Sequence, residues 1–197
     1  TGSVGKTTTK NMIHAMASAL APAHKTIANY NDGLESIRFI LSSLSDQHRY
    51  CAAEFSEVGD LEKQLEFYRP QVAVITNIYF EHASKIEKKG FRGEGVVRHL
   101  VELAAGVIRH LQPGGTCVLN ADGENFALLE AEARKSVHAR IMTCGTADTN
   151  HVRILSMTCD DEGSDIELGI ADRRYAYRLS FPGRHMAENS VVAATAM

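Results

Sequence analysis

A glycine-rich segment at the start of the chain carries the residues with the clearest chemical potential. It reads Gly2-Ser3-Val4-Gly5-Lys6-Thr7 and matches the second half of the GxxxxGK[ST] phosphate-loop pattern. In such a loop the glycines let backbone N–H groups turn toward phosphate oxygens, and the helix that follows adds its positive end. Lys6 would reach the terminal phosphates of ATP, and the Thr7 hydroxyl would bind Mg²⁺. The residues expected to contact the nucleotide here are Gly2, Ser3, Val4, Gly5, Lys6, Thr7 and Thr8.

Two side chains elsewhere are suited to a magnesium ion held near this loop. Glu54 closes a short apolar segment that begins at Tyr50, and His82 follows the apolar segment from Val72 to Ile78. In open α/β sheets, ligands bind beyond the carboxyl ends of the strands, and Mg²⁺ prefers carboxylate and other oxygen ligands. Glu54 could equally begin a solvated turn. The pattern predicts a metal site formed by Thr7, Glu54 and His82.

Composition restricts the class of protein. The chain has 197 residues, with 21 Lys and Arg against 24 Asp and Glu, a net charge of −3 and 44% hydrophobic residues. These values fit one globular domain and argue against a basic nucleic-acid binder. No apolar run reaches the roughly 18 residues of a membrane span. The four cysteines form no CxxC pair and no basic-then-apolar leader is seen, so we expect free thiols and a cytoplasmic protein.

Hydrophobic spacing predicts the elements that must position these residues. Five segments have the apolar periodicity of a helix: 12–20, 34–44, 61–68, 96–111 and 126–133. Three short apolar segments fit buried strands: 50–55, 72–78 and 116–119. Because strands and helices alternate, we expect an α/β fold, a P-loop NTPase-like mostly parallel sheet flanked by helices.

The pattern changes in the last quarter of the chain. Three alternating segments, separated by turn residues, fit antiparallel strands: 152–157, 165–170 and 175–181. They predict a small antiparallel sheet over 151–182, within the same domain and followed by a helix over 187–197. A phosphate loop normally follows a buried strand, and none precedes Thr1. We therefore expect residues 1–197 to form one domain that is incomplete at both ends.

Five segments, in order, resemble the Mur ligases, ATP-dependent amide-forming enzymes of cell-wall peptide synthesis. They are TGSVGKTTTK (1–10), the strand ending in Glu54, RPQVAVITNIYFEH (69–82), GGTCVLNAD (114–122) and PGRHMAENSVVAA (182–194). The resemblance implies the family's central ATP-binding domain, which is flanked by an N-terminal domain for the UDP precursor and a C-terminal domain for the incoming amine. Within the family, the chain looks most similar to the branch that adds D-alanyl-D-alanine to the muramoyl tripeptide.

The resemblance also implies roles for individual residues. Lys6, Glu54 and His82 would be catalytic, and the residues near the nucleotide base would be Asn120, Asp122 and Asn189. In the family, ATP phosphorylates a carboxylate of the UDP-linked precursor, and the amine of an amino acid or dipeptide attacks the acyl phosphate. We expect this peptidoglycan-precursor chemistry from the full-length protein, and no ligation from this domain alone, because the other substrates bind elsewhere.

Two positions depart from the family pattern. Met186 stands where the family has the first asparagine of HNxxN, and Leu100 stands where many members carry a carbamylated lysine. These departures support one alternative, a nucleotide-binding P-loop module without ligase activity. A P-loop phosphotransferase is a further alternative. The GGTCVLNAD and PGRHMAENS segments disfavour the phosphotransferase.

Overall fold

The computed structural model describes most of the chain. The described residues are 1–2, 5–29, 34–56, 61–66, 68–79, 86–88, 90–136 and 138–197, without the side chains of 34–37. In these ranges, none of the helices combines the length and the apolar character that crossing a membrane requires. His82, Ser3 and Val4 lie outside the described residues, as does part of the charged segment that follows His82.

A six-stranded sheet, in the order β3-β4-β5-β6-β7-β8, organises the described part of the chain. Its strands are β3 (Val72–Ile75), β4 (Thr116–Asn120), β5 (Arg140–Gly145), β6 (Val152–Cys159), β7 (Ser164–Ile170) and β8 (Arg173–Leu179). Strands β3 to β6 pair in parallel, and β6 to β8 pair antiparallel. The antiparallel strands therefore continue the parallel sheet, which they join where Cys144 and Gly145 of β5 pair with β6.

Two shorter strands form a separate parallel pair. They are β1 (Lys25–Ala28) and β2 (His48–Ala52). In this pair Lys25 lies opposite His48, and Ala28 lies opposite Ala52. Thr1 bonds to the other sheet, because its backbone nitrogen donates to the Val74 carbonyl (2.7 Å) and its own carbonyl accepts from the Thr76 N–H (3.0 Å). The glycine-rich segment thus begins beside the carboxyl end of β3.

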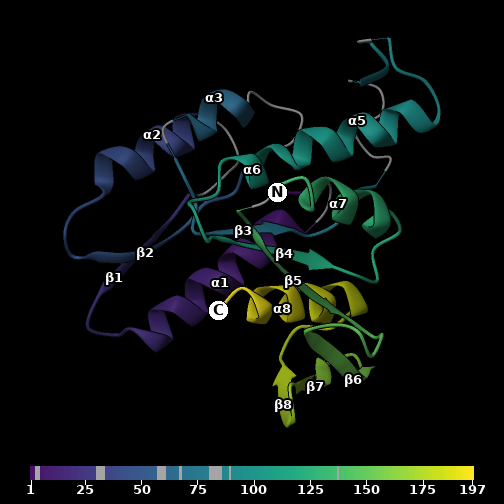
Figure 1. Ribbon diagram of the computed structural model, residues 1–197. Coiled ribbons are helices and arrows are strands. Elements are labelled where there is room, and N and C mark those ends of the chain that lie inside the picture. Colours follow the sequence, from purple (N-terminus) through teal and green to yellow (C-terminus); the bar gives the residue numbers. More distant parts are fainter. Residues whose placement is uncertain are drawn as a thin grey trace.

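Helices cover both faces of the larger sheet (Figure 1). The described helices are α1 (Lys6–Leu20), α2 (Leu34–Ser43), α3 (Leu61–Leu65), α5 (Glu94–Ala104), α6 (Gly106–Arg109), α7 (Phe126–Ala133) and α8 (Arg184–Thr195). In Figure 1, α5, α6 and α7 lie on one side of the sheet, and α1 and α8 lie on the other. The expected α/β fold with a mostly parallel sheet is confirmed.

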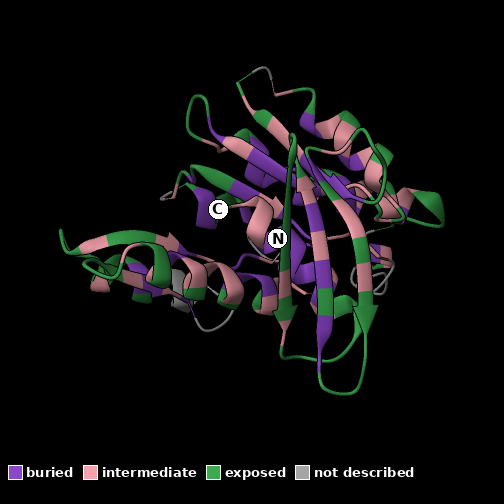
Figure 2. Cartoon of the chain, turned by 90° about the horizontal axis from the view of Figure 1, so that it is seen from below, coloured by how far each residue is buried: buried purple, intermediate pink, exposed green. Residues whose placement is uncertain are grey.

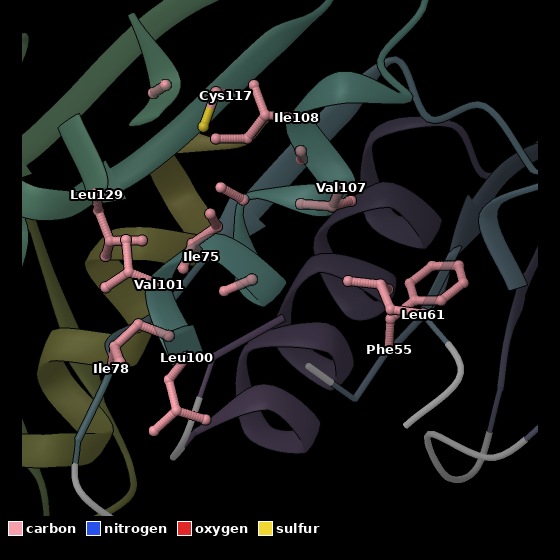
Figure 3. Close-up of a cluster of buried hydrophobic side chains, with 14 of the residues drawn as sticks. Phe55, Leu61, Ile75, Ile78, Leu100, Val101, Val107, Ile108, Cys117 and Leu129 are labelled. Atoms are coloured by element: carbon pink, nitrogen blue, oxygen red, sulfur yellow. The ribbon is translucent and has the colours of Figure 1, made fainter. Parts of the chain in front are cut away.

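Alternation along the central strands creates a core on each face. Cys117 and Leu119 of β4 belong to a cluster with residues of α5, α6 and α7 (Figure 3), whereas Val118 between them belongs to a cluster with α8. Successive side chains of a strand point to opposite faces, so one apolar run serves both cores. Leu100 lies in the first cluster and is 0% exposed. Figure 2 shows burial along the strands, and the antiparallel strands differ in it: β8 begins with four consecutive exposed residues, whereas β7 alternates between buried and less buried residues.

Some local predictions were wrong. Strands β1 and β5 were not predicted, because their short apolar stretches lie among polar residues. The helix expected over 96–111 is broken at Ala105 into α5 and α6. Gly106 is a weak helix former and packs closely on α3, so that an added Cβ would lie 3.1 Å from Glu62 Oε1. Strand β2 ends at Ala52, and Glu54 therefore follows the strand instead of closing it.

Candidate functional site

Both glycines of the loop have a backbone conformation that requires glycine. Gly2 and Gly5 have φ angles of +129° and +81°, a region that side chains with a Cβ rarely adopt. A Cβ on Gly2 would clash with the Thr76 hydroxyl and lie 2.8 Å from the Asn77 carbonyl oxygen. Gly5 is the N-cap of α1, so the positive end of the helix and its unpaired N–H groups open toward the loop.

The Lys6 side chain folds back toward Gly2, at the start of the loop. Its ammonium group donates a hydrogen bond to the Gly2 carbonyl oxygen (2.8 Å), and the side chain is half-buried. The first residue of α1 thus places a positive charge beside the helix N-terminus. Together these groups form a region of positive potential that suits phosphate oxygens.

Thr7 and Glu54 come together, as the sequence predicts. The Thr7 hydroxyl donates to Glu54 Oε1 (2.8 Å), although the two residues come from α1 and from the segment after β2. Glu54 is 6% exposed, and its Oε2 atom accepts no hydrogen bond within the described part of the chain. A buried carboxylate oxygen without a donor is costly unless a cation or water satisfies it. A hydroxyl and a carboxylate are also the ligands that Mg²⁺ prefers, so these two residues fit the metal.

Two further residues, which the sequence analysis did not assign to the site, complete this corner. Lys10 lies one turn beyond Thr7 on α1, is 6% exposed, and places its ammonium nitrogen 3.8 Å from Glu54 Oε2. The same ammonium group donates to the Asn29 carbonyl oxygen. Asn29 directly follows β1 and is 2% exposed; its side chain bonds to both the N–H and the C=O of Glu54. The spacing of Lys10 from Thr7 was a usable signal, because residues three apart share a helix face.

Asn189 of α8 lies directly against the loop. A Cβ added to Gly5 would clash with the Asn189 side-chain oxygen and lie 2.7 Å from its nitrogen. Asn189 is 9% exposed. The structure therefore places Asn189 at the backbone of the phosphate loop, where it limits the room behind Gly5. A contact with a nucleotide base stays a prediction.

Asn120 and Asp122 lie together at the end of β4. The Asp122 carboxylate accepts hydrogen bonds from the Thr146 N–H (3.0 Å) and hydroxyl (3.1 Å), and Asn120 accepts from the Asp122 N–H (3.1 Å). Asp122 therefore fastens the turn after β5 to the turn after β4. Its oxygens already have donors, so a nucleotide contact from Asp122 would compete with these bonds.

A cavity of about 480 Å³ borders the site. Its lining includes Lys6, Lys10 and Glu54 of the site, further residues of α1, and residues of β2 and β3. Arg49 and Arg69 also line it, so positive side chains are not confined to the loop. The cavity therefore offers cationic groups to an anionic ligand in more than one place.

The comparisons with known proteins agree with this geometry. A family model described as the Mur ligase middle domain matches residues 1–197. A UDP-N-acetylmuramoyl-tripeptide–D-alanyl-D-alanine ligase from Synechocystis sp. is 32% identical over 147 residues, 74% of this chain and 30% of that protein. A UDP-N-acetylmuramate–L-alanine ligase from Streptomyces coelicolor is 28% identical over 197 residues, 99% of this chain and 38% of that protein.

Solved structures show the same fold. A crystal structure of MurF from Acinetobacter baumannii has a TM-score of 0.80 at 22% identity, covering 99% of this chain and 40% of that one. The MurF ligase from Thermotoga maritima in complex with ADP has a TM-score of 0.76 at 17% identity, covering 98% and 42%. The chain thus spans less than half the length of these relatives. With a phosphate loop, a buried carboxylate beside it and a family model matched over residues 1–197, the chain belongs to the Mur ligase middle domain family.

Proposed function

We propose that this chain is the nucleotide-binding domain of an ATP-dependent ligase that forms an amide bond in peptidoglycan precursor synthesis. The observation that carries the proposal is the contact between Thr7 and the buried Glu54 carboxylate at the phosphate loop. We take residues 1–197 as the central domain, with the antiparallel segment over 151–182 inside it. The ligase relatives and the ADP complex of the Thermotoga maritima MurF ligase support this assignment.

The residues of the loop would position ATP and stabilise the charge that develops on the transferred phosphoryl group. Lys6 and the N–H groups at the start of α1 would bind the phosphate oxygens. Thr7 and Glu54 would hold Mg²⁺, with His82 as the third predicted ligand. When bound, the metal would neutralise charge on the phosphates of ATP. The substrate carboxylate would attack the γ-phosphorus of ATP, forming an acyl phosphate and releasing ADP. An amine would then attack the acyl carbon, forming the amide, losing a proton and releasing inorganic phosphate.

The substrates follow from the named relatives. We propose a UDP-linked muramoyl peptide as the carboxylate substrate and D-alanyl-D-alanine as the amine, as in the name of the Synechocystis sp. relative. The flanking domains of the full-length protein would bind both.

A cytoplasmic reaction agrees with the cysteines, which are all free. Burial raises the pKa of Cys117 and Cys144 to about 12, so both thiols stay protonated and unreactive.

Lys6→Ala in the full-length protein tests nucleotide binding. Loss of a charge-assisted phosphate contact, about 1.5–3 kcal/mol, should weaken ATP binding at least about tenfold in calorimetric titration. Lys25→Ala, which removes an exposed lysine of β1, is the matched control and should bind normally. Unchanged affinity in Lys6→Ala would contradict the assignment of the loop.

Glu54→Gln tests the metal-dependent step. The substitution keeps the size of the side chain and removes its charge, so it should reduce turnover far more than ATP affinity, because the charge matters most in the transition state. Amide formation and nucleotide affinity should both be measured in the full-length protein. Normal turnover would place the metal site elsewhere.

A nucleotide-binding module without ligation is the second candidate, and one observation favours it. Leu100, at the position where the family pattern carries a carbamylated lysine, is fully buried in the core beside α7 and supplies no charge. Ligation by the full-length protein with amino acids and dipeptides separates the two functions. If the ligase is active, its rate should not depend on bicarbonate.

A further inference from the structure

We propose that Asn29 is a positioning residue for Glu54, fixing the carboxylate in the orientation that binds a divalent cation. The proposal rests on the proposed function in one respect, that Glu54 is a metal ligand. Asn29 belongs to neither the phosphate loop nor the segment that contains Glu54. It acts through the backbone of Glu54 and does not itself touch the cation.

The Asn29 side chain makes hydrogen bonds to the backbone of Glu54 like those that a neighbouring strand would make. It does so after β2 has ended at Ala52. Its amide nitrogen donates to the Glu54 carbonyl oxygen (2.8 Å), and its amide oxygen accepts from the Glu54 N–H (2.8 Å). Buried backbone groups need such partners, and one side-chain amide here supplies both. Because the two bonds fix the peptide groups on either side of the Glu54 Cα, they also fix the direction of its side chain.

The other contacts of Glu54 leave one oxygen for a cation. Thr7 donates to Oε1, and Oε2 accepts no hydrogen bond from the described residues. The Lys10 ammonium group lies 3.8 Å from Oε2, beyond hydrogen-bonding distance, and is itself held by the Asn29 carbonyl oxygen. Asn29 thus fixes both the carboxylate and the nearest charge, so a small shift of Asn29 would move both.

A purely structural amide at this place would behave differently. It would join the ends of β1 and β2, and its loss would lower the melting temperature without changing the response to metal. A positioning amide also determines how strongly Glu54 binds Mg²⁺. Residues that orient metal ligands change metal affinity by about 10–100-fold when they are replaced. The Mg²⁺ dependence of nucleotide binding therefore separates the two roles.

The test is calorimetric titration of the full-length protein with a non-hydrolysable ATP analogue over a series of Mg²⁺ concentrations. Asn29→Ala should raise the half-saturating Mg²⁺ concentration about tenfold or more and leave the Mg²⁺-free affinity for the analogue unchanged. Asn29→Ser, too short to span both backbone groups, should act in the same direction and serves if Asn29→Ala does not fold. Thr26→Val is the matched control, since Thr26 bonds to His14 and Ser18 of α1 without touching Glu54.

Each outcome decides between the possibilities. An unchanged Mg²⁺ requirement in folded Asn29 variants overturns the proposal, as does an equal shift in Thr26→Val, which would indicate general loosening between α1 and β1. Glu54→Gln separates this proposal from the function on which it rests. If Glu54→Gln leaves the Mg²⁺ requirement unchanged, Glu54 is not the ligand; if only Glu54→Gln shifts it, Asn29 has no positioning role.

Hydrogen exchange on the unaltered protein gives a second measurement that needs no variant. The Glu54 N–H should exchange as slowly as the N–H groups of the central strands, because its partner is a buried side chain. Exchange as fast as in the exposed turns would show that the bond to Asn29 does not persist and would overturn the proposal.

Discussion

The corner at the phosphate loop and the antiparallel strands β6 to β8 use polar residues in opposite ways. At the loop, Lys10, Asn29 and Glu54 are nearly inaccessible, and their bonds link α1 to the segments after β1 and β2. On the antiparallel strands, Arg178 pairs with Asp160 and Asp165 at the surface. Water competes for exposed pairs and cannot compensate the buried groups.

The polar residues at the loop are buried and depend on one another for hydrogen bonds. The charged residues on the antiparallel strands are exposed and can be solvated by water instead. Replacing one hydrogen-bond partner at the loop leaves the other partner buried and unsatisfied. Replacing one member of an ion pair on the strands leaves the other member exposed, where water solvates it. We therefore expect changes at the loop to affect both stability and binding. Changes on the antiparallel strands should affect stability alone.

The largest effect should come from Gly5→Ala. Its positive φ costs about 1–2 kcal/mol for a residue with a Cβ, and the clash with Asn189 adds about 1–3 kcal/mol of overpacking. Gly114→Ala is the matched control, because Gly114 also has a positive φ (+77°) but no atom within 4 Å of an added Cβ. Denaturant unfolding should show clearly greater destabilisation for Gly5→Ala, and a double variant with Asn189→Ala should recover part of the difference. Equal losses in both glycine variants would show that the loop is not confined by Asn189.

An intermediate effect is expected where the two regions meet. The Tyr177 hydroxyl of β8 lies 2.7 Å from Ser190 Oγ of α8, and the Ser190 hydroxyl donates to the Ala187 carbonyl. Because the Ser190 hydroxyl hydrogen is used in that bond, the Tyr177 hydroxyl is the donor to Ser190 Oγ, and burial raises the pKa of Tyr177. Tyr177→Phe should reduce the free energy of unfolding by about 0.5–1.5 kcal/mol without weakening ATP binding. Tyr175→Phe, at an exposed position of the same strand, is the control and should change neither the free energy of unfolding nor ATP binding. A loss of ATP affinity in Tyr177→Phe would show that the antiparallel strands affect nucleotide binding.

The smallest effect should come from Asp160→Asn. A hydrogen bond from Arg178, followed by the Glu162 N–H, lowers the pKa of Asp160 below its usual value. The lowered pKa means that the carboxylate stabilises the fold above its unfolded pKa and loses this contribution as the pH falls through the folded pKa. The variant should melt about 2 °C lower or less at pH 7, and the difference from the unaltered protein should disappear in acid. A difference that persists at low pH would have a cause other than this charge.

Sequence reasoning was most successful where a residue acts through its neighbours in the chain. The order Gly5-Lys6-Thr7 predicts a loop and the first turn of α1, and the apolar run ending near Glu54 predicts a strand whose end lies near that loop. The structure brings Thr7 and Glu54 together, and their binding of a metal stays a prediction. The antiparallel strands were recognised because alternation and turn residues are local signals.

The rest depended on which segments lie side by side. Strand β1 is short and half-polar, so its position beside β2 could not be predicted from periodicity, and neither could the role of Asn29 at its end. Asn189 was assigned to the nucleotide base by resemblance, whereas its contact with Gly5 depends on how α8 crosses α1. The break at Ala105 was missed because the packing of Gly106 on α3 has no local signal.

The contact between Gly5 and Asn189 has a consequence for how the protein is made. Within these residues the loop is synthesised long before the helix that confines it, which ends at Thr195. Contacts between such distant residues form late, since the intervening chain must close first. During synthesis the glycine loop therefore lacks its contact with Asn189 until α8 packs against it, and the ability of the loop to bind phosphate should arise late in the folding of this domain.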